Sequence, residues 1–312
     1  MNFQRIHPAA YAIFLALAII AWFFATTGRS QTRDSNKQTT SSIKRVLKPI
    51  ASATSSAENK GLASSILATA ASRNSILINE LNWTFGGKQQ HGWYLYSALI
   101  GRLLNASDDG ASAPFAASLI KWQRDTGLTA NGILAEDSLY AMVGYWQQNR
   151  LKERDVANAA DLIVAPVSDF YDPSRPAELR QVERQTYFAY KAMLAAAAAD
   201  SSLNLRLDNE GSLAPEQKYL KIVSAFRSPQ YQEQLRKQSP NAGRAGLAVT
   251  SPHFTGRALD LYVGGEPVET RDSNRAIQVQ TPVYRWLVRN ADRFGFRPYY
   301  YEPWHWEYVG KQ

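Results

Sequence analysis

The chain has 312 residues, of which 45% are hydrophobic and 20% charged, a composition typical of folded proteins rather than of disorder throughout. A domain takes about 100–200 residues, so this length allows two folded units. Cysteine is absent, which excludes disulfides, cysteine-ligated metal sites, catalytic thiols and lipoprotein anchors. The net charge is +8, and residues 1–60 carry most of it, with eight Lys or Arg against two Asp or Glu. A nucleic-acid binder concentrates positive charge where it grips phosphate, so we expect no nucleic-acid partner.

The first apolar segment predicts a membrane helix. Residues 9–27 hold no charge, and 19 residues come close to the about 20 that a spanning helix needs. Aromatic residues near its C-terminal end suit the membrane interface. A cleaved signal peptide is the alternative, but residues 23–28 offer no good small-x-small cleavage site, so we favour a retained anchor within residues 1–28.

The charges flanking this segment bear on its orientation. Arg5 precedes it, whereas Arg29, Arg33 and Lys37 follow it. Taken alone, the positive-inside rule would keep the C-terminal side in the cytoplasm. Residues 29–81 are rich in Ser, Thr, Ala and Lys, and we interpret them as a stalk in which only Ser64–Leu77 has a helical pattern.

A helical module follows at residues 82–150. Apolar residues recur at spacings of three and four, and glycine-containing turns separate the periodic segments. The pattern predicts three short helices, at Trp93–Leu104, Phe115–Trp122 and Ser138–Trp146.

Four short motifs in this module resemble the second half of the three-helix peptidoglycan-binding repeat. They are Trp122-Gln123, Gly127-Leu128, Gly132-Ile133 and Asp137-Ser138-Leu139. The resemblance implies a module that holds the protein on peptidoglycan. The alternative is a helical spacer, because turn glycines alone are common.

A proline-containing linker, 151–176, leads into a C-terminal domain, 177–312. Helices and strands mix there without βαβ alternation, which predicts an α+β fold with a small sheet. The expected helices are Ala177–Ala199, Ser228–Lys237 and Pro282–Phe294, and the expected strands are Tyr219–Phe226, Arg257–Val263, Phe296–Tyr301 and Trp304–Val309.

Two histidines of this domain lie in dense polar surroundings. His253 is followed by Gly256, which permits a tight bend, and then by Asp260 within an apolar strand. His305 follows Glu302 and begins the last strand. Two histidines and one aspartate form a three-ligand zinc site with an open position, as catalytic zinc sites have.

Each residue also has an ordinary interpretation. A histidine in an aromatic strand is often a core residue, and an arginine can satisfy an aspartate in a strand. The two motifs together, with Glu302 beside one histidine, favour a metal. Glu307 lies two residues after His305, and we interpret it as structural or as a support for that ligand.

Three motifs, in the correct order, resemble the VanY-type zinc D-alanyl-D-alanine carboxypeptidases and related endopeptidases of the LAS metallopeptidase group. The matching residues are Ser224, Phe226, Arg227, Ser228 and Gln232 in the first motif, Ser251, His253, Gly256, Ala258 and Asp260 in the second, and Glu302, Trp304, His305 and Tyr308 in the third. Phe226 departs from the usual tyrosine, and Leu203–Gln217 is an unfamiliar insertion.

The resemblance implies a role for each residue of the site. Zinc is expected on His253, Asp260 and His305, and Glu302 is expected to be the catalytic acid and base. Arg227 would bind the substrate carboxylate or the developing oxyanion. The remaining assignments are hydrogen bonds from Gln232 and Ser251 to the peptide, and Trp304 as either a pocket wall or a core residue.

These expectations combine into a zinc D,D-carboxypeptidase that trims peptidoglycan stem peptides. Its substrate lies outside the cytoplasmic membrane, so we expect a single-pass inner-membrane protein with a periplasmic catalytic domain, against the local Lys and Arg count. The alternatives are an endopeptidase of the same fold and a non-catalytic wall-binding scaffold. The complete ligand set argues against a decayed site.

Overall fold

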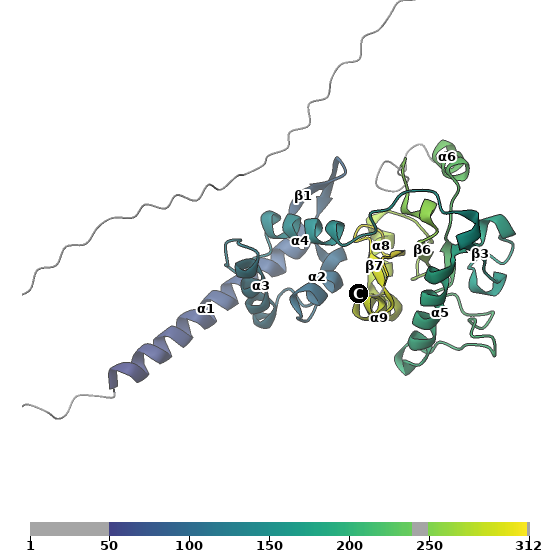
Figure 1. The fold of residues 1–312 in the computed structure, drawn as a ribbon. Helices are drawn as coiled ribbons and strands as arrows, with labels where there is room; N and C mark the ends of the chain where they lie inside the picture. Colours follow the sequence, from purple (N-terminus) through teal and green to yellow (C-terminus); the bar gives the residue numbers. More distant parts are fainter. Residues whose placement is uncertain (1–49, 239–248, 311–312) are drawn as a thin grey trace, which may run out of the picture. The chain divides into compact units, whose positions relative to one another are not determined.

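The computed structural model describes residues 50–238 and 249–310 (Figure 1). The chain divides into Met1–Pro49 and Ile50–Gln312, and all of the described residues belong to the second unit. The predicted membrane segment 9–27 therefore falls outside them, as does the first part of the predicted stalk. In the part that is described, no helix combines the length and the apolar character needed to cross a membrane.

The second part of the predicted stalk is a long helix, α1 (Ile50–Glu80). We expected helical structure there only at residues 64–77. The last turns of α1 are anchored by packing, because Ala70, Asn74 and Leu77 are buried. This end of the segment interpreted as a stalk therefore packs on the module that follows it.

The three predicted helices of the module are present as α2 (Ser97–Leu104), α3 (Ala113–Asp125) and α4 (Glu136–Gln148). The Ser112 hydroxyl caps α3 by accepting from the Phe115 N–H at 3.2 Å. A hairpin that the sequence did not predict precedes them, formed by β1 (Asn82–Phe85) and β2 (Lys88–His91). Gly86 and Gly87 both have positive φ, as a two-residue hairpin loop requires.

The residues that resemble the peptidoglycan-binding repeat have structural roles in the loop between α3 and α4. The buried Gln123 side chain donates to the Ile133 carbonyl and to the Ser138 hydroxyl, both at 3.0 Å, and accepts from Gly132 N–H at 2.9 Å. Asn74 of α1 holds the same loop by donating to the Gly132 carbonyl at 2.9 Å. Gln123 and Ser138 of the motif therefore stabilise the loop between α3 and α4 through hydrogen bonds.

The predicted linker 151–176 contains regular structure that pairs with the C-terminal region. It contains β3 (Leu162–Val164), which pairs antiparallel with β4 (Gln181–Glu183). This pairing also overrides the long helix expected from residue 177. The helix α5 (Arg184–Ala198) starts only after Glu183, whose carboxylate accepts from the backbone N–H groups of the first turn.

The central element of the C-terminal region is a four-stranded antiparallel sheet, which confirms the α+β fold. Its strand order is β5-β6-β8-β7, with β5 (Ile222–Ser224), β6 (Ala258–Leu261), β7 (Phe296–Pro298) and β8 (His305–Tyr308). The strand expected from Tyr219 begins only at β5. Leu220 precedes it with a φ of 68°, which is not strand geometry.

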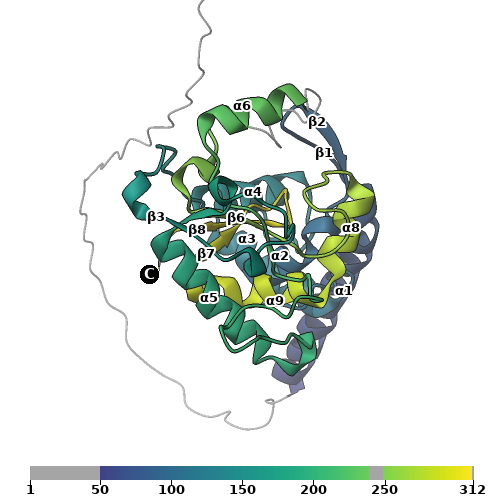
Figure 2. The same cartoon turned by 90° about the vertical axis from the view of Figure 1, so that its right-hand side faces the viewer.

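The described residues of this region also form the helices α6 (Pro229–Gln238), α8 (Asp272–Gln280) and α9 (Pro282–Asn290). Thr281 caps α9, and Pro282 occupies its first position, a common helix start. Tyr284 of α9 lies against Trp306 of β8 with ring centroids 6.5 Å apart, so α9 packs on the Trp306 face of the sheet (Figure 2).

Short 3-10 turns connect these elements. They are η1 (Tyr94–Tyr96), η2 (Ala159–Asp161), η3 (Val167–Asp169), η4 (Ala177–Leu179), η5 (Ser201–Leu203), η6 (Pro252–Thr255) and η7 (Ala291–Phe294).

Candidate metal centre

His253 is held in the 3-10 turn η6. The Ser251 hydroxyl caps this turn by accepting from the His253 N–H at 3.3 Å, and Gly256 ends it with a φ of 67°. The His253 ring is buried, and its Nδ1 lies 2.6 Å from the Ala225 carbonyl oxygen. A carbonyl only accepts hydrogen bonds, so Nδ1 carries the proton and Nε2 presents a lone pair.

Asp260 and His305 are presented by neighbouring strands. The two residues are directly paired in the register of β6 and β8, so their side chains leave the same face of the sheet. The Asp260 Oδ1 lies 2.9 Å from the His305 Nδ1 and 3.3 Å from the His253 Nε2. Sequence reasoning placed these three residues together, and the structure brings them together.

The donor set fits a metal ion. One ligand atom from each of His253, Asp260 and His305 lies within 4.8 Å of the other two, and all three side chains are buried. With Nδ1 protonated, the His253 Nε2 lone pair faces a carboxylate oxygen, and two acceptors at 3.3 Å repel each other unless a cation or a proton lies between them. Two imidazoles and a carboxylate are the ligand types of catalytic zinc sites.

Arg227 lies beside this cluster and holds the second oxygen of Asp260. Its Nη2 donates to Asp260 Oδ2 at 2.5 Å, its Nε donates to the Ser224 hydroxyl at 2.9 Å, and its Nη1 lies 3.5 Å from the Gln232 Oε1. Ser224 faces Asp260 in the sheet register. The upstream motif thus orients the aspartate of the cluster through its arginine.

The protein environment shifts the pKa values of the two histidines in opposite directions. Burial lowers the pKa of His253 to about 4, and the charge of Arg227 adds to the effect. Burial also opposes charge on His305, but the carboxylates of Asp260 and Glu307 outweigh it and raise the pKa of His305 to about 9. Burial alone would raise the pKa of Asp260, yet His253 and Arg227 hold it well below its usual value.

Glu302 lies in the turn before β8. Its carbonyl accepts from His305 N–H at 2.9 Å, so the turn ends directly at His305. The side chain is 8% exposed, and burial raises the pKa of its carboxyl to about 8, opposed by the nearby charge of His305. A cation on the neighbouring ligands would favour the carboxylate.

Ser251 and Trp304 have structural contacts. Ser251 is buried and caps the turn that carries His253. Trp304 is 3% exposed and belongs to the hydrophobic core, and its carbonyl accepts from Leu261 N–H at 2.8 Å. Of the two interpretations of Trp304, the structure favours the core residue.

Sequence reasoning missed Arg150 and assigned only a general supporting role to Glu307. The Glu307 Oε1 lies 3.2 Å from the His305 Nε2, and it accepts from Arg150 Nε at 3.1 Å and Nη2 at 2.5 Å. Burial would raise the pKa of Glu307, but His305 and Arg150 lower it to about 2. No local motif marks Arg150, because 157 residues separate it from its partner.

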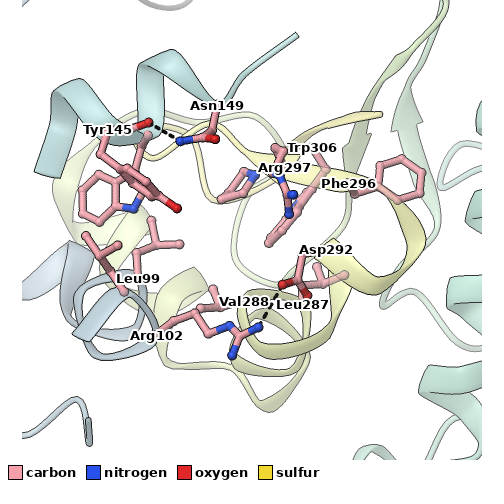
Figure 3. Close-up of a pocket in the computed structure, with 13 residues that line it drawn as sticks. Leu99, Arg102, Tyr145, Asn149, Leu287, Val288, Asp292, Phe296, Arg297 and Trp306 are labelled. Atoms are coloured by element: carbon pink, nitrogen blue, oxygen red, sulfur yellow. Dashed lines mark hydrogen bonds and ion pairs between the residues drawn. The ribbon is translucent and has the colours of Figure 1, made fainter. Parts of the chain in front are cut away.

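A cavity of about 320 Å³ lies elsewhere, between the helical module and the C-terminal region (Figure 3). Its walls include Leu99 and Trp146 of the module and Leu287 and Trp306 of the C-terminal region. Trp306 follows His305 along β8 and so points to the opposite face of the sheet. None of the residues predicted for the site lines this cavity.

Comparison with known proteins identifies the region that carries the cluster. Residues 179–311 match the family model of VanY, D-alanyl-D-alanine carboxypeptidase. This region is a VanY-type domain. All three residues of the cluster, together with Glu302 and Arg227, lie within the matched range of the VanY-type domain. The resemblance noted from the motifs is thereby confirmed.

A solved structure described as the LdcB LD-carboxypeptidase, with the molecular basis of its peptidoglycan recognition, is also similar. The two share 23% identity over 51% of this chain and 72% of that chain, with a TM-score of 0.36. No curated protein matches the chain.

Proposed function

We propose that the protein is a zinc-dependent D-alanyl-D-alanine carboxypeptidase that acts on peptidoglycan stem peptides. The observation that carries the proposal is the buried cluster of His253, Asp260 and His305 with Glu302 beside it, inside a VanY-type domain. An endopeptidase of the same fold is the runner-up. The complete donor set disfavours a non-catalytic scaffold.

The three residues of the cluster would hold the zinc ion. When bound there, zinc lowers the pKa of a coordinated water towards about 7 and polarises the carbonyl that is cleaved. Neighbouring groups of the protein already orient two of these side chains. The Ala225 carbonyl fixes the tautomer of His253, and Arg227 fixes the orientation of Asp260.

Glu302 would move the proton. Its carboxylate would take a proton from the attacking water and return it to the nitrogen of the leaving amino acid. Its position in the turn that ends at His305 keeps it next to the reacting atoms, and its burial excludes bulk water from the transfer.

Arg227 would bind the terminal carboxylate of the substrate. A guanidinium carries five N–H groups, and three of them serve the contacts with Ser224, Asp260 and Gln232. The others are assigned here to the substrate, whose carboxylate a fixed guanidinium recognises well. Gln232 and Ser251 are assigned to the peptide backbone of the substrate.

Mass spectrometry of purified muropeptides after incubation with the protein tests the activity. Loss of one D-Ala from pentapeptide stems supports the D,D-carboxypeptidase. Loss of D-Ala only from tetrapeptide stems identifies an L,D-carboxypeptidase instead, and the appearance of separated stems from cross-linked dimers identifies an endopeptidase. Unchanged muropeptides with zinc-loaded protein would contradict the enzyme itself.

The proposal includes anchoring in the inner membrane through residues 9–27, with the catalytic domain in the periplasm. The support is the uncharged apolar segment and the location of the substrate. A reporter fused after residue 60 should be active only outside the cytoplasm. Activity only inside would reverse both the orientation and the choice of substrate.

The helical module is proposed to bind peptidoglycan, on the strength of the motifs from Trp122 to Leu139. The full chain should sediment with purified peptidoglycan more than an unrelated protein of similar charge does. Equal pelleting would favour the spacer interpretation.

A further inference from the structure

Arg150 links the end of the helical module to the metal centre. It follows α4 by two residues, and its guanidinium donates to the Glu307 Oε1 from both Nε, at 3.1 Å, and Nη2, at 2.5 Å. The other carboxylate oxygen of Glu307 accepts from the Leu151 N–H at 2.9 Å. Two consecutive residues, the last of the module and the one that follows it, thus hold both oxygens of one buried carboxylate.

That carboxylate is the group that contacts the far side of the His305 ring. The Glu307 side chain is 0% exposed, and its Oε1 lies 3.2 Å from the His305 Nε2, while the His305 Nδ1 faces Asp260. The two ring nitrogens of His305 therefore have different partners. Nε2 is held from the module side, and Nδ1 points into the cluster.

The sheet leaves room for this arrangement. Glu307 faces Ala258 in the register of β6 and β8, so a small side chain stands opposite the carboxylate. A larger residue at that position would compete for the space that Arg150 and Glu307 fill.

Arg150 contacts a second neighbour of His305. Its guanidinium carbon lies 3.8 Å from the centre of the Tyr299 ring, and that ring meets the His305 ring edge-on with centroids 5.9 Å apart. The backbone N–H of Tyr299 also donates to the His305 carbonyl at 3.0 Å. One guanidinium therefore holds both groups that flank the ring.

We propose that Arg150 is a positioning residue for the metal ligand His305 and acts through Glu307 and Tyr299. The inference rests on the proposed zinc site and adds a residue outside the VanY-type match. Glu307, held by Arg150, accepts a hydrogen bond from the protonated Nε2 of His305. The lone pair of the His305 Nδ1 then stays free for the metal. The helical module is then part of the metal centre's support as well as a separate binding unit.

Without Arg150, the buried carboxylate of Glu307 loses its charged partner, and the ring of His305 loses its fixed orientation. Partners of this kind behind a metal-binding histidine usually contribute about 10–100-fold to metal affinity or activity. A merely structural Arg150 would instead lower stability and leave the affinity for zinc unchanged.

Arg150→Met tests the proposal in the full-length protein, with Arg102→Met as the matched control. Arg102 also reaches from the module to an acidic residue of the VanY-type domain, Asp292, at 2.8 Å, but both side chains are more than a third exposed and neither contacts the cluster. Zinc affinity is measured by competition with a chelator, and the visible spectrum of the Co²⁺-loaded protein reports the ligand set. Thermal unfolding of the metal-free proteins separates folding from binding.

Arg150→Met should weaken zinc binding about 10–100-fold and change the Co²⁺ spectrum. Arg102→Met should stay within about twofold of the wild type, since exposed ion pairs contribute little. Equal affinities and spectra for the two variants would overturn the role of Arg150. If Arg150→Met does not fold, Arg150→Lys decides, because lysine keeps the charge but not the paired donors. Wild-type affinity in Arg150→Lys overturns the proposal.

The same measurements separate this inference from the proposed function. Wild-type protein that fails to bind zinc contradicts the metal site and the inference together. Wild-type protein that binds zinc and cleaves muropeptides, with Arg150→Met unchanged in both, overturns only the inference.

Discussion

Asp260 and His305 stand directly opposite each other in the register of β6 and β8. Their side-chain atoms Oδ1 and Nδ1 lie 2.9 Å apart because antiparallel pairing brings opposite side chains together. Two of the three residues of the cluster are thus placed by backbone hydrogen bonds. The third, His253, comes from a capped turn whose carbonyl at residue 253 accepts from the Arg227 N–H at 3.1 Å.

The first prediction separates binding from proton transfer. Glu302→Gln should keep zinc but lose about 10²–10⁴-fold in turnover, because the amide cannot take up the proton. His305→Ala should lose zinc as well, since two ligands are too few for a catalytic zinc site. Bound zinc and released D-Ala are measured on the same preparations.

Two results would contradict this division. Near-normal turnover in Glu302→Gln would remove Glu302 as the base. Full zinc content in His305→Ala would remove His305 from the ligand set.

The residues of the candidate centre could be predicted from the sequence because they lie in short motifs on simple elements. Asp260 falls in a strand where alternate residues share a face, and His305 begins another. Gly256 signalled the bend beside His253, and it does adopt a positive φ. Local patterns were therefore enough to single out each residue, and the family resemblance indicated that these residues form one site.

The support around the centre could not be predicted, because it depends on contacts between distant segments. Arg150 lies far from Glu307 in the sequence, and nothing in its neighbours marks it. The pairing of β3 with β4 likewise overrode the alanine-rich helical pattern from residue 177. Asn74, in a segment interpreted as a stalk, is completely buried by the loop at Gly132.

The second prediction concerns Gly256. A Cβ built there would lie 2.8 Å from the Leu162 Cδ2 and 2.9 Å from the Glu183 backbone nitrogen. Gly256→Ala adds this clash to the cost of a left-handed conformation, so we expect a loss of about 2–4 kcal/mol in the free energy of unfolding. Denaturant unfolding measures it.

Gly127→Ala is the matched control. Gly127 also has positive φ, 75°, but open space surrounds its Cβ position, so only the conformational cost of about 1–2 kcal/mol applies. An equal decrease in the free energy of unfolding of the two variants would show that the contacts of residue 256 with β3 and β4 add nothing to the cost of Gly256→Ala.

The third prediction tests whether α1 belongs to the module. Asn74 donates to the Gly132 carbonyl and accepts from the Leu134 N–H at 2.8 Å. Asn74→Ala leaves both backbone groups buried and unpaired, which should lower the free energy of unfolding by about 2–4 kcal/mol. Ser75→Ala, on the exposed side of the same helix, should change it by less than about 0.5 kcal/mol. A similar small change in both would mean that α1 does not stabilise the module.

The last prediction concerns the hairpin of β1 and β2 and the turn that carries Glu302. Phe85 packs against Tyr300 and Tyr301 with ring centroids 5.1 Å and 5.0 Å apart, directly before Glu302 in the chain. Aromatic pairs of this kind each contribute about 0.5–1.5 kcal/mol beyond the area they bury. Phe85→Ala should therefore loosen the turn and lower kcat several-fold.

Zinc affinity should fall less than kcat in the same variant, because His253 is held by η6, and the pairing of β6 and β8 also holds Asp260 and His305. Phe85→Leu, which keeps most of the apolar volume, should recover much of the turnover. The measurements are kcat on muropeptides, chelator competition and thermal unfolding of all three proteins. If Phe85→Ala loses stability while its kcat equals that of the wild type, the hairpin does not position Glu302. If its zinc affinity falls together with kcat, the turn and the ligands are not independently supported.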